Sequence, residues 1–373
     1  MNKKISLSLT LLISLTLLIF GCKKKDPYLK YGDYSYKIED SVAVIVFYNG
    51  ENKDVDIPAE IDGYPVEIIG DMAFQANEKH PGEEYIKVTL ERVKIPESVK
   101  TIGWGAFRGN SLTEITIPNS VVSISNYAFD RNKLQSITFS DSLSAISHGA
   151  FGYNNLKKLV IPESVKSIGI NAFENNQIEE LIIPNTISVI DNEAFSHNKL
   201  DSLILPESIR TIGYRAFFNN ELVYVSFPDS IEKIDAGAFA YNKLTYIKIP
   251  ERLTIIEEDV FSFNNLTSIR IPASVNTIES AAFMANELTT VELPDSLKSI
   301  KYLAFLVNHL TNIKIPKTVD FIGKESFRAN DSLQYFILPG TDPSQKWKSS
   351  NDKIFQSGDT ISDFFPSYSL IKE

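Results

Sequence analysis

The sequence IPESVKSIGINAFENNQIEELIIPNTISVIDNEAFSHN, which spans Ile161–Asn198, contains one phrase twice, 22 residues apart. The phrase reads I-P-x-[ST]-[VI]-x-x-I, then a turn, then A-F-x-x-N. A phrase repeated at a fixed period indicates a chain built from stacked copies of one small structural unit. Most of its side chains must then serve contacts between copies, which leaves few of them for binding or catalysis.

The Phe of this phrase recurs every 22 residues without a slip. The column comprises Phe107, Phe129, Phe151, Phe173, Phe195, Phe217, Phe239, Phe261, Phe283, Phe305 and Phe327. Phe74 precedes Phe107 by 33 residues, which is one repeat plus an 11-residue insertion near residues 77–87. Because a 22-residue unit cannot bury its apolar faces alone, stacking of neighbours must make a continuous core.

Each repeat is interpreted as one coil of a solenoid, mainly β with short helical turns. Leu112, Ile115 and Ile117 point inward from a strand, since strand side chains alternate between its two faces. Pro118 ends that strand because it has no N–H for a ladder. A second inward pair ends at Ile124, and a short helical turn is expected to bring the next Ala and Phe inward.

An Asn follows every Phe of the repeat by three residues. Asn is a poor core residue unless its donors and acceptor are all satisfied. We therefore predict a structural ladder in which each Asn bonds the backbone of tight turns in its own coil and the next. The ladder comprises Asn77, Asn110, Asn132, Asn154, Asn176, Asn198, Asn220, Asn242, Asn264, Asn286, Asn308 and Asn330.

The combined pattern L-x-x-I-x-I-P-x-S-V-x-x-I-G-x-x-A-F-x-x-N resembles the BspA-like, or treponemal-type, leucine-rich repeat. The resemblance covers residues 57–339 and implies a right-handed superhelix of 22-residue coils. Residues 33–56 resemble the usual N-terminal cap of such arrays. Residues 340–373 leave the repeat but stay apolar, so we expect a C-terminal cap there. Many members of the family carry Cys where this chain has the Asn column.

Composition and motifs favour binding over catalysis. The net charge of −10 argues against general nucleic-acid binding, which needs a basic face. The chain contains no glycine-rich phosphate loop and no zinc or hydrolase motif, and no cofactor is expected. A column of Ser and Thr recurs near each Pro, with Arg252 in one coil, but hydroxyl nucleophiles need a base. The four His fall in different phases of the repeat: His80, His148, His197 and His309.

The N-terminus predicts a lipid-anchored bacterial envelope protein. Residues 1–21 carry two Lys and then an apolar stretch, which indicates an export signal that is removed. Leu18–Cys22 resembles a lipobox, and Cys22 is the only cysteine, so we predict its lipidation. Residues 22–32 would form a tether at the outer membrane or cell surface rather than the inner membrane. An uncleaved membrane anchor and an ordinary signal peptide are the alternatives.

Three functions remain open from the sequence. The resemblance implies a surface-exposed module for protein–protein interaction or adhesion, with a host matrix protein or another envelope protein as partner. A passive envelope or periplasmic protein is the alternative. A carbohydrate-acting enzyme of the β-helix type would need acids at particular coils, and the outward columns show no matched cluster. We expect a non-enzymatic monomer.

The candidate partner-binding residues come from the outward positions of the strands. Adjacent coils lie about 4.8 Å apart, so residues spaced by 22 stack into columns. The candidates are Val160, Ile182 and Ile204 as an apolar strip, Tyr224 and Tyr246 as its diagonal continuation, and Lys248 and Arg270 at its edge. Exposed apolar patches with polar rims mark interaction sites. The competing interpretation is that Val and Ile merely favour strands.

Overall fold

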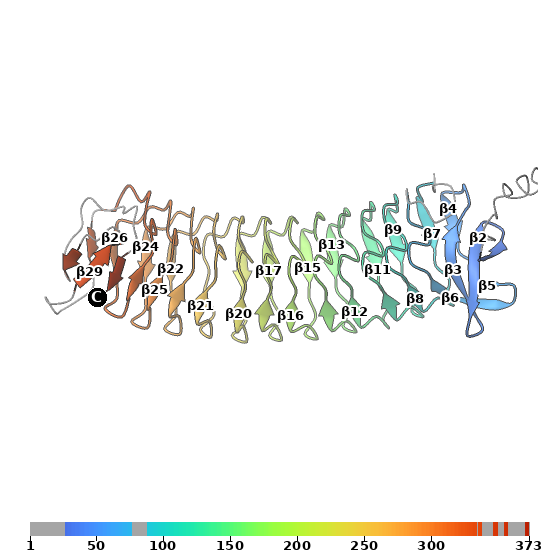
Figure 1. Ribbon diagram of the computed structural model, residues 1–373, viewed down its shortest axis with the longest axis horizontal. Coiled ribbons are helices and arrows are strands. Elements are labelled where there is room, and N and C mark those ends of the chain that lie inside the picture. The colour runs from blue at the N-terminus through green and yellow to red at the C-terminus, as the bar shows by residue number, and fades with distance from the viewer. Residues whose placement is uncertain are drawn as a thin grey trace, which may run out of the picture.

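The chain forms one elongated β-solenoid whose coils stack along the long axis (Figure 1). The computed structural model describes residues 27–76, 88–333, 335–337, 346–349, 354–356 and 370–372. Two rows of short parallel strands run along the solenoid, one on each side of each coil. The predicted fold class, a leucine-rich repeat solenoid of 22-residue coils, is therefore confirmed.

The first row, here called row A, contains three-residue strands from the L-x-x-[IL]-x-[IL] segment. From β4 to β26 the middle residue of each strand points inward, as Leu159 and Leu203 do at 2% exposure each. The strands of row A are β4 (Asp54–Asp56), β7 (Arg92–Lys94), β9 (Glu114–Thr116), β11 (Ser136–Thr138), β13 (Lys158–Val160), β15 (Glu180–Ile182), β17 (Ser202–Ile204), β19 (Tyr224–Ser226), β22 (Ser268–Arg270), β24 (Thr290–Glu292), β26 (Asn312–Lys314) and β28 (Tyr335–Ile337).

The second row, row B, contains mostly two-residue strands that end at the Ile column. The parallel register pairs Ile with Ile, as in Ile168 with Ile190 and Ile190 with Ile212. The strands of row B are β6 (Tyr64–Ile69), β8 (Thr101–Ile102), β10 (Ser123–Ile124), β12 (Ala145–Ile146), β14 (Ser167–Ile168), β16 (Val189–Ile190), β18 (Thr211–Ile212), β20 (Lys233–Ile234), β21 (Ile255–Ile256), β23 (Thr277–Ile278), β25 (Ser299–Ile300) and β27 (Phe321–Ile322).

Additional strands cover both ends of row B. At the N-terminal end, β1 (Leu29–Tyr31), β2 (Tyr34–Glu39) and β3 (Val42–Tyr48) form an antiparallel meander, and β3 pairs in parallel with β6. The short strand β5 (Glu60–Ile61) also pairs with β6. At the C-terminal end, β31 (Leu370–Lys372) pairs antiparallel with β27, and β29 (Lys346–Ser349) and β30 (Ile354–Gln356) extend the sheet. The two end strands of row B, β6 and β27, are therefore each paired on their outer edge.

The Phe column forms a continuous stack of twelve rings along the axis. Neighbouring ring centroids lie between 5.0 Å (Phe74 and Phe107) and 6.0 Å (Phe239 and Phe261), with nearly parallel planes. Tyr48 from β3 stacks on the first ring at 5.4 Å, a contact that the repeat pattern does not predict. The offset-stacked geometry is one that aromatic pairs prefer, so each ring buries its neighbour and adds to the core.

The short helical turns expected before each Phe are wrong, because these segments are tight turns. Tyr127 and Arg131, on either side of Phe129, have positive φ values of 58° and 56°. The Phe129 N–H donates to the carbonyl of Ala150 in the next coil (2.9 Å), whereas a helix would direct it to its own coil. Within the described residues there is no helix that could span a membrane.

Each described Asn of the ladder bonds at least three backbone groups. Asn198 Nδ2 donates to the carbonyls of Phe195 (3.1 Å) and Phe173 (3.0 Å), and its Oδ1 accepts the N–H of Ile178 (3.0 Å). Phe173 and Ile178 belong to the preceding coil, so the expected direction, toward the next coil, is wrong. The eleven Asn from Asn110 to Asn330 share these three bonds and are all buried. Asn77 lies outside the described residues.

We expect Asn198→Ala to lower the free energy of unfolding by about 1–3 kcal/mol, because the Ile178 N–H loses its acceptor and the carbonyls of Phe173 and Phe195 each lose one of their two Asn donors. Asn198→Asp should destabilise more than Ala at neutral pH, since a carboxylate would face the carbonyls of Phe195 and Phe173. Denaturant unfolding measures both. The matched control is Asn185→Ala, at an exposed position, where a change within about 0.5 kcal/mol is expected. Equal effects at the two sites would contradict the ladder.

Candidate interaction surface

The apolar strip, defined as Val160, Ile182, Ile204, Tyr224 and Tyr246, lies on the outer face of row A. The exposed fractions of these side chains, in that order, are 49%, 54%, 74%, 50% and 61%. Val160 and Ile182 are direct partners in the β13–β15 pairing, so their side chains are neighbours. The strip therefore places exposed apolar side chains on five successive coils, on a face with no covering element in the described structure.

Charged and polar groups border this strip. Lys158 Nζ pairs with Glu180 Oε2 at 2.7 Å alongside Val160, and both charged side chains are about two-thirds exposed. Ser202 lies on the same strand as Ile204, and Ser226 is the direct partner of Ile204 on the neighbouring strand β19. An apolar centre with a polar rim is the composition found at protein interaction sites.

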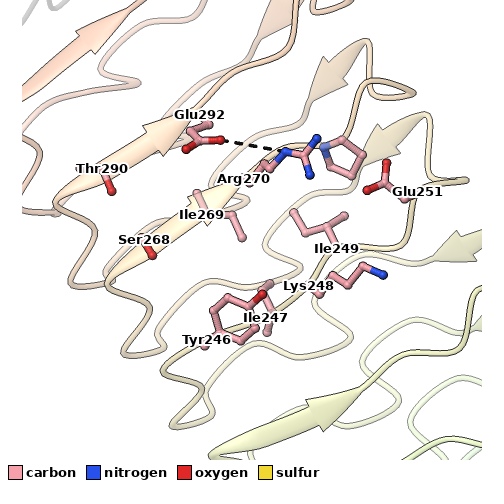
Figure 2. Close-up of a pocket in the computed structure, with 11 residues that line it drawn as sticks. Tyr246, Ile247, Lys248, Ile249, Glu251, Ser268, Ile269, Arg270, Thr290 and Glu292 are labelled. Atoms are coloured by element: carbon pink, nitrogen blue, oxygen red, sulfur yellow. Dashed lines mark ion pairs between the residues drawn. The ribbon is translucent and has the colours of Figure 1, made fainter.

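A shallow cleft of about 260 Å³ lies at the far end of the strip, between residues 246–251 and 268–272 (Figure 2). Tyr246 stands at one side of this cleft, and Lys248 and Arg270 line it from adjacent coils. Lys248 Nζ lies 3.9 Å from Asp229, and Arg270 Nε lies 4.0 Å from Glu292. Both separations are at the upper limit of an ion pair, so both cations remain open to an additional partner.

The coil of residues 246–264 is less tightly joined to its neighbours than the others. Strands of row A pair two by two, but in the described structure residues 246–248 pair with neither β19 nor β22 and make no backbone hydrogen bond. Row B is also interrupted before this coil, between β20 and β21, and once more between β10 and β12. The 6.0 Å ring separation of Phe239 and Phe261 occurs at the same boundary.

Arg252 interrupts the Ser and Thr column within this coil. In neighbouring coils the corresponding hydroxyl donates to the preceding coil, as Ser230 Oγ does to the Ile209 carbonyl (2.7 Å) and Ser274 Oγ to the Leu253 carbonyl (2.6 Å). Arg252 has no hydroxyl, and its guanidinium lies 3.6 Å from Glu232 on the surface. Sequence reasoning identified the substitution but could not connect it to a cleft.

The Ser and Thr column is bonded in part. Five of its hydroxyls donate to backbone carbonyls of the preceding coil, whereas the buried hydroxyls of Ser98, Ser120, Ser164 and Thr318 have no hydrogen-bond partner among the described residues. His148, His197 and His309 contact Tyr127, Asn219 and Glu287 respectively, each at a separate place. In residues 27–76 and 88–333 no three His, Cys, Asp or Glu side chains gather as a metal site. His80 and Cys22 lie outside the described residues.

The turn side of the solenoid has a second polar depression of about 430 Å³. Its most buried charge is Asp130, which accepts a hydrogen bond from Arg108 Nε at 2.8 Å and lies 3.5 Å from Arg131 Nε. Burial raises the pKa of Asp130, and the two guanidinium groups oppose that rise. Arg131 also lies 4.2 Å over the ring of Tyr153. These groups satisfy one another across adjacent coils, which is the arrangement of a structural ion-pair network.

An exposed aromatic row follows on the same turn side. Tyr241 and Phe263 stack at 4.3 Å and are 45% and 37% exposed, and Phe218 lies 5.2 Å from Tyr241. These rings face one another along the axis, so mainly their edges reach solvent. The exposed fractions of the five side chains of the apolar strip, 49–74%, are higher than those of Tyr241 and Phe263.

Comparisons with known proteins agree with this architecture. A leucine-rich repeat protein from Bacteroides ovatus is 27% identical, with a TM-score of 0.65, and the match covers 82% of this chain and 87% of that chain. The pneumococcal vaccine antigen PcpA is 19% identical, with a TM-score of 0.53, over 82% of this chain and 80% of that chain, and shares the fold. No curated protein matches the sequence.

The repeat itself decides the family. A model described as "BspA type Leucine rich repeat region" matches six copies, over residues 82–201, 166–288 and 255–370. These ranges span most of the chain and contain the Phe stack from Phe107 onward, the Asn ladder from Asn110 onward and row A from β7 onward. The chain therefore belongs to the BspA-type leucine-rich repeat family.

Proposed function

We propose that this protein is a lipid-anchored, surface-exposed module of the bacterial envelope that binds a protein partner through row A. Interaction with other proteins is the general role of leucine-rich repeats, and the solenoid presents a long outer face suited to it. The proposed partner is a host matrix protein or another envelope protein, and the protein acts as a monomer without enzymatic activity.

The apolar strip is the observation that carries this proposal. Five large apolar side chains on successive coils are each about half exposed or more, next to Lys248 and Arg270. Tyr and Arg are enriched among the residues that contribute most to binding energy. A strand preference of Val and Ile explains their presence in strands, but it does not explain the two adjacent Tyr and the two cations.

We predict that Ile182→Ser, Ile204→Ser and Tyr224→Ser together abolish capture of the partner from envelope or host-matrix extract. The three side chains lie at the centre of the strip, where their truncation removes the largest apolar contact area. The readout is a pull-down with wild type and the triple variant. The melting temperature should be unchanged, because all three side chains are solvent-exposed.

The matched control is Val122→Ser with Val189→Ser, since these side chains are 53% and 46% exposed but belong to the row B side. This control should retain capture. If the triple variant retains every partner of the wild type, binding does not occur on the strip. If wild type captures nothing, the alternative hypothesis of a passive envelope protein is favoured.

The anchor is tested through Cys22. Two or more acyl chains hold a protein on a membrane stably, whereas one gives marginal binding. We expect the wild type to fractionate with membranes and resist alkaline wash, and Cys22→Ser to be released. Retention of Cys22→Ser in washed membranes would refute the lipid anchor.

Surface exposure requires a separate measurement. We expect protease added to intact cells to digest the wild type while a periplasmic marker protein stays intact. Protection of the protein until the outer membrane is permeabilised would place it inside the envelope and contradict surface exposure.

A further inference from the structure

The cleft at the end of the strip suggests the chemistry of the partner, an inference that rests on the proposed function. We infer that row A binds an extended protein segment whose apolar residues lie on the strip and whose adjacent Asp or Glu enters the cleft between Tyr246 and Arg270. The segment is thus apolar in one half and acidic in the other.

Charge along the outer face of row A supports an acidic half. Outward positions at the strip are apolar, Ser, or the Lys158–Glu180 pair, whereas the corresponding column beyond Tyr246 reads Lys248, Arg270, Glu292 and Lys314. That stretch has three cations and one acid in a chain whose net charge is −10. A local cationic surface on an acidic protein favours approach of an acidic partner and disfavours a basic one.

The counter-ions now beside Lys248 and Arg270 hold them weakly. Lys248 and Asp229, 3.9 Å apart, are 69% and 91% exposed. Arg270 and Glu292, 4.0 Å apart, are 73% and 78% exposed. Exposed pairs of this kind contribute about 0–1 kcal/mol, so a partner carboxylate can replace or join them at little loss. Glu251 and Glu292 line the cleft together with the two cations, and Glu251 lies at the side of the cleft opposite Tyr246, so a new anion would approach from the side of Tyr246 (Figure 2).

The backbone beside the cleft adds unused hydrogen-bonding capacity. Within the described structure, residues 246–248 make no backbone hydrogen bond, unlike the paired strands β17, β19, β22 and β24. Tyr246, Ile247 and Lys248 all line the cleft, so their peptide groups lie close to any side chain that enters it. A carboxylate that accepts hydrogen bonds from backbone N–H groups as well as from a cationic side chain forms charge-assisted hydrogen bonds, which are stronger than neutral ones.

The distances fit a short extended segment. Ile182 and Arg270 are four coils apart, which at about 4.8 Å per coil is roughly 19 Å along the axis. An extended peptide covers this length with about six residues. The segment would run across the strands, along the solenoid axis. Side chains on one of its faces would then contact the strip at one end of the segment and the cleft at the other end.

A library of random dodecapeptides displayed on phage, panned against the purified folded protein, tests the inference. We expect enrichment of peptides that place Asp or Glu next to several apolar residues. A selected peptide should bind Lys248→Glu with Arg270→Glu at least 10-fold more weakly than wild type, and Ile204→Ser should also weaken it. The charge-matched control, Lys166→Glu with Lys199→Glu at exposed positions outside row A, should bind normally.

Three results would overturn the inference. These are enrichment without acidic residues, unchanged affinity for the Lys248→Glu, Arg270→Glu variant, and competition by polygalacturonate as effective as by unlabelled peptide. The last would indicate a carboxylated polysaccharide instead of a protein segment. If the strip variant loses the extract partner while the charge variant keeps it, the proposed function stands and only this inference fails.

Discussion

The side-chain amide of the repeated Asn is the interaction on which the whole solenoid depends. It donates to two carbonyls and accepts one N–H, and these three groups belong to two successive coils. Asp has no N–H to donate, and Gln would place its amide one carbon farther from the turn. Across the loosened boundary, Asn264 still bonds the carbonyl of Phe239 and the N–H of Leu244 at 3.0 Å each. The amide therefore fixes the register where strand pairing is absent.

This use of polar groups separates structural columns from columns that are free to vary. The Asn amides and several Ser or Thr hydroxyls satisfy backbone groups between coils, so they have little capacity left for a ligand. Outward positions of row A bond nothing in the core, and there the side chain changes from coil to coil. Such positions on a rigid scaffold can acquire binding specificity without a loss of fold, as loops do in other proteins.

The sequence predicts the inward columns well because apolar residues at a fixed period can all be buried in only one stacking register. The spacing of Phe107 and Phe129 locates the stack, and the exposed strip follows from strand alternation at Val160 and Ile182. The turns at Tyr127 and Arg131 were not predictable, since neither residue type signals a positive φ. Nor did the sequence reveal the cleft, because pairing between short strands depends on small displacements of whole coils.

The direction of the contacts between coils has a mechanical consequence. Strand ladders, Asn amides and stacked rings all join a coil to its neighbours along the axis, so an axial pull loads the coils in series. Such a chain would yield one coil at a time, each releasing roughly 75 Å of polypeptide. The boundary before residues 246–264, where both rows are interrupted, would open first. A solenoid built in this way would lengthen stepwise under an axial pull while its remaining coils stay folded.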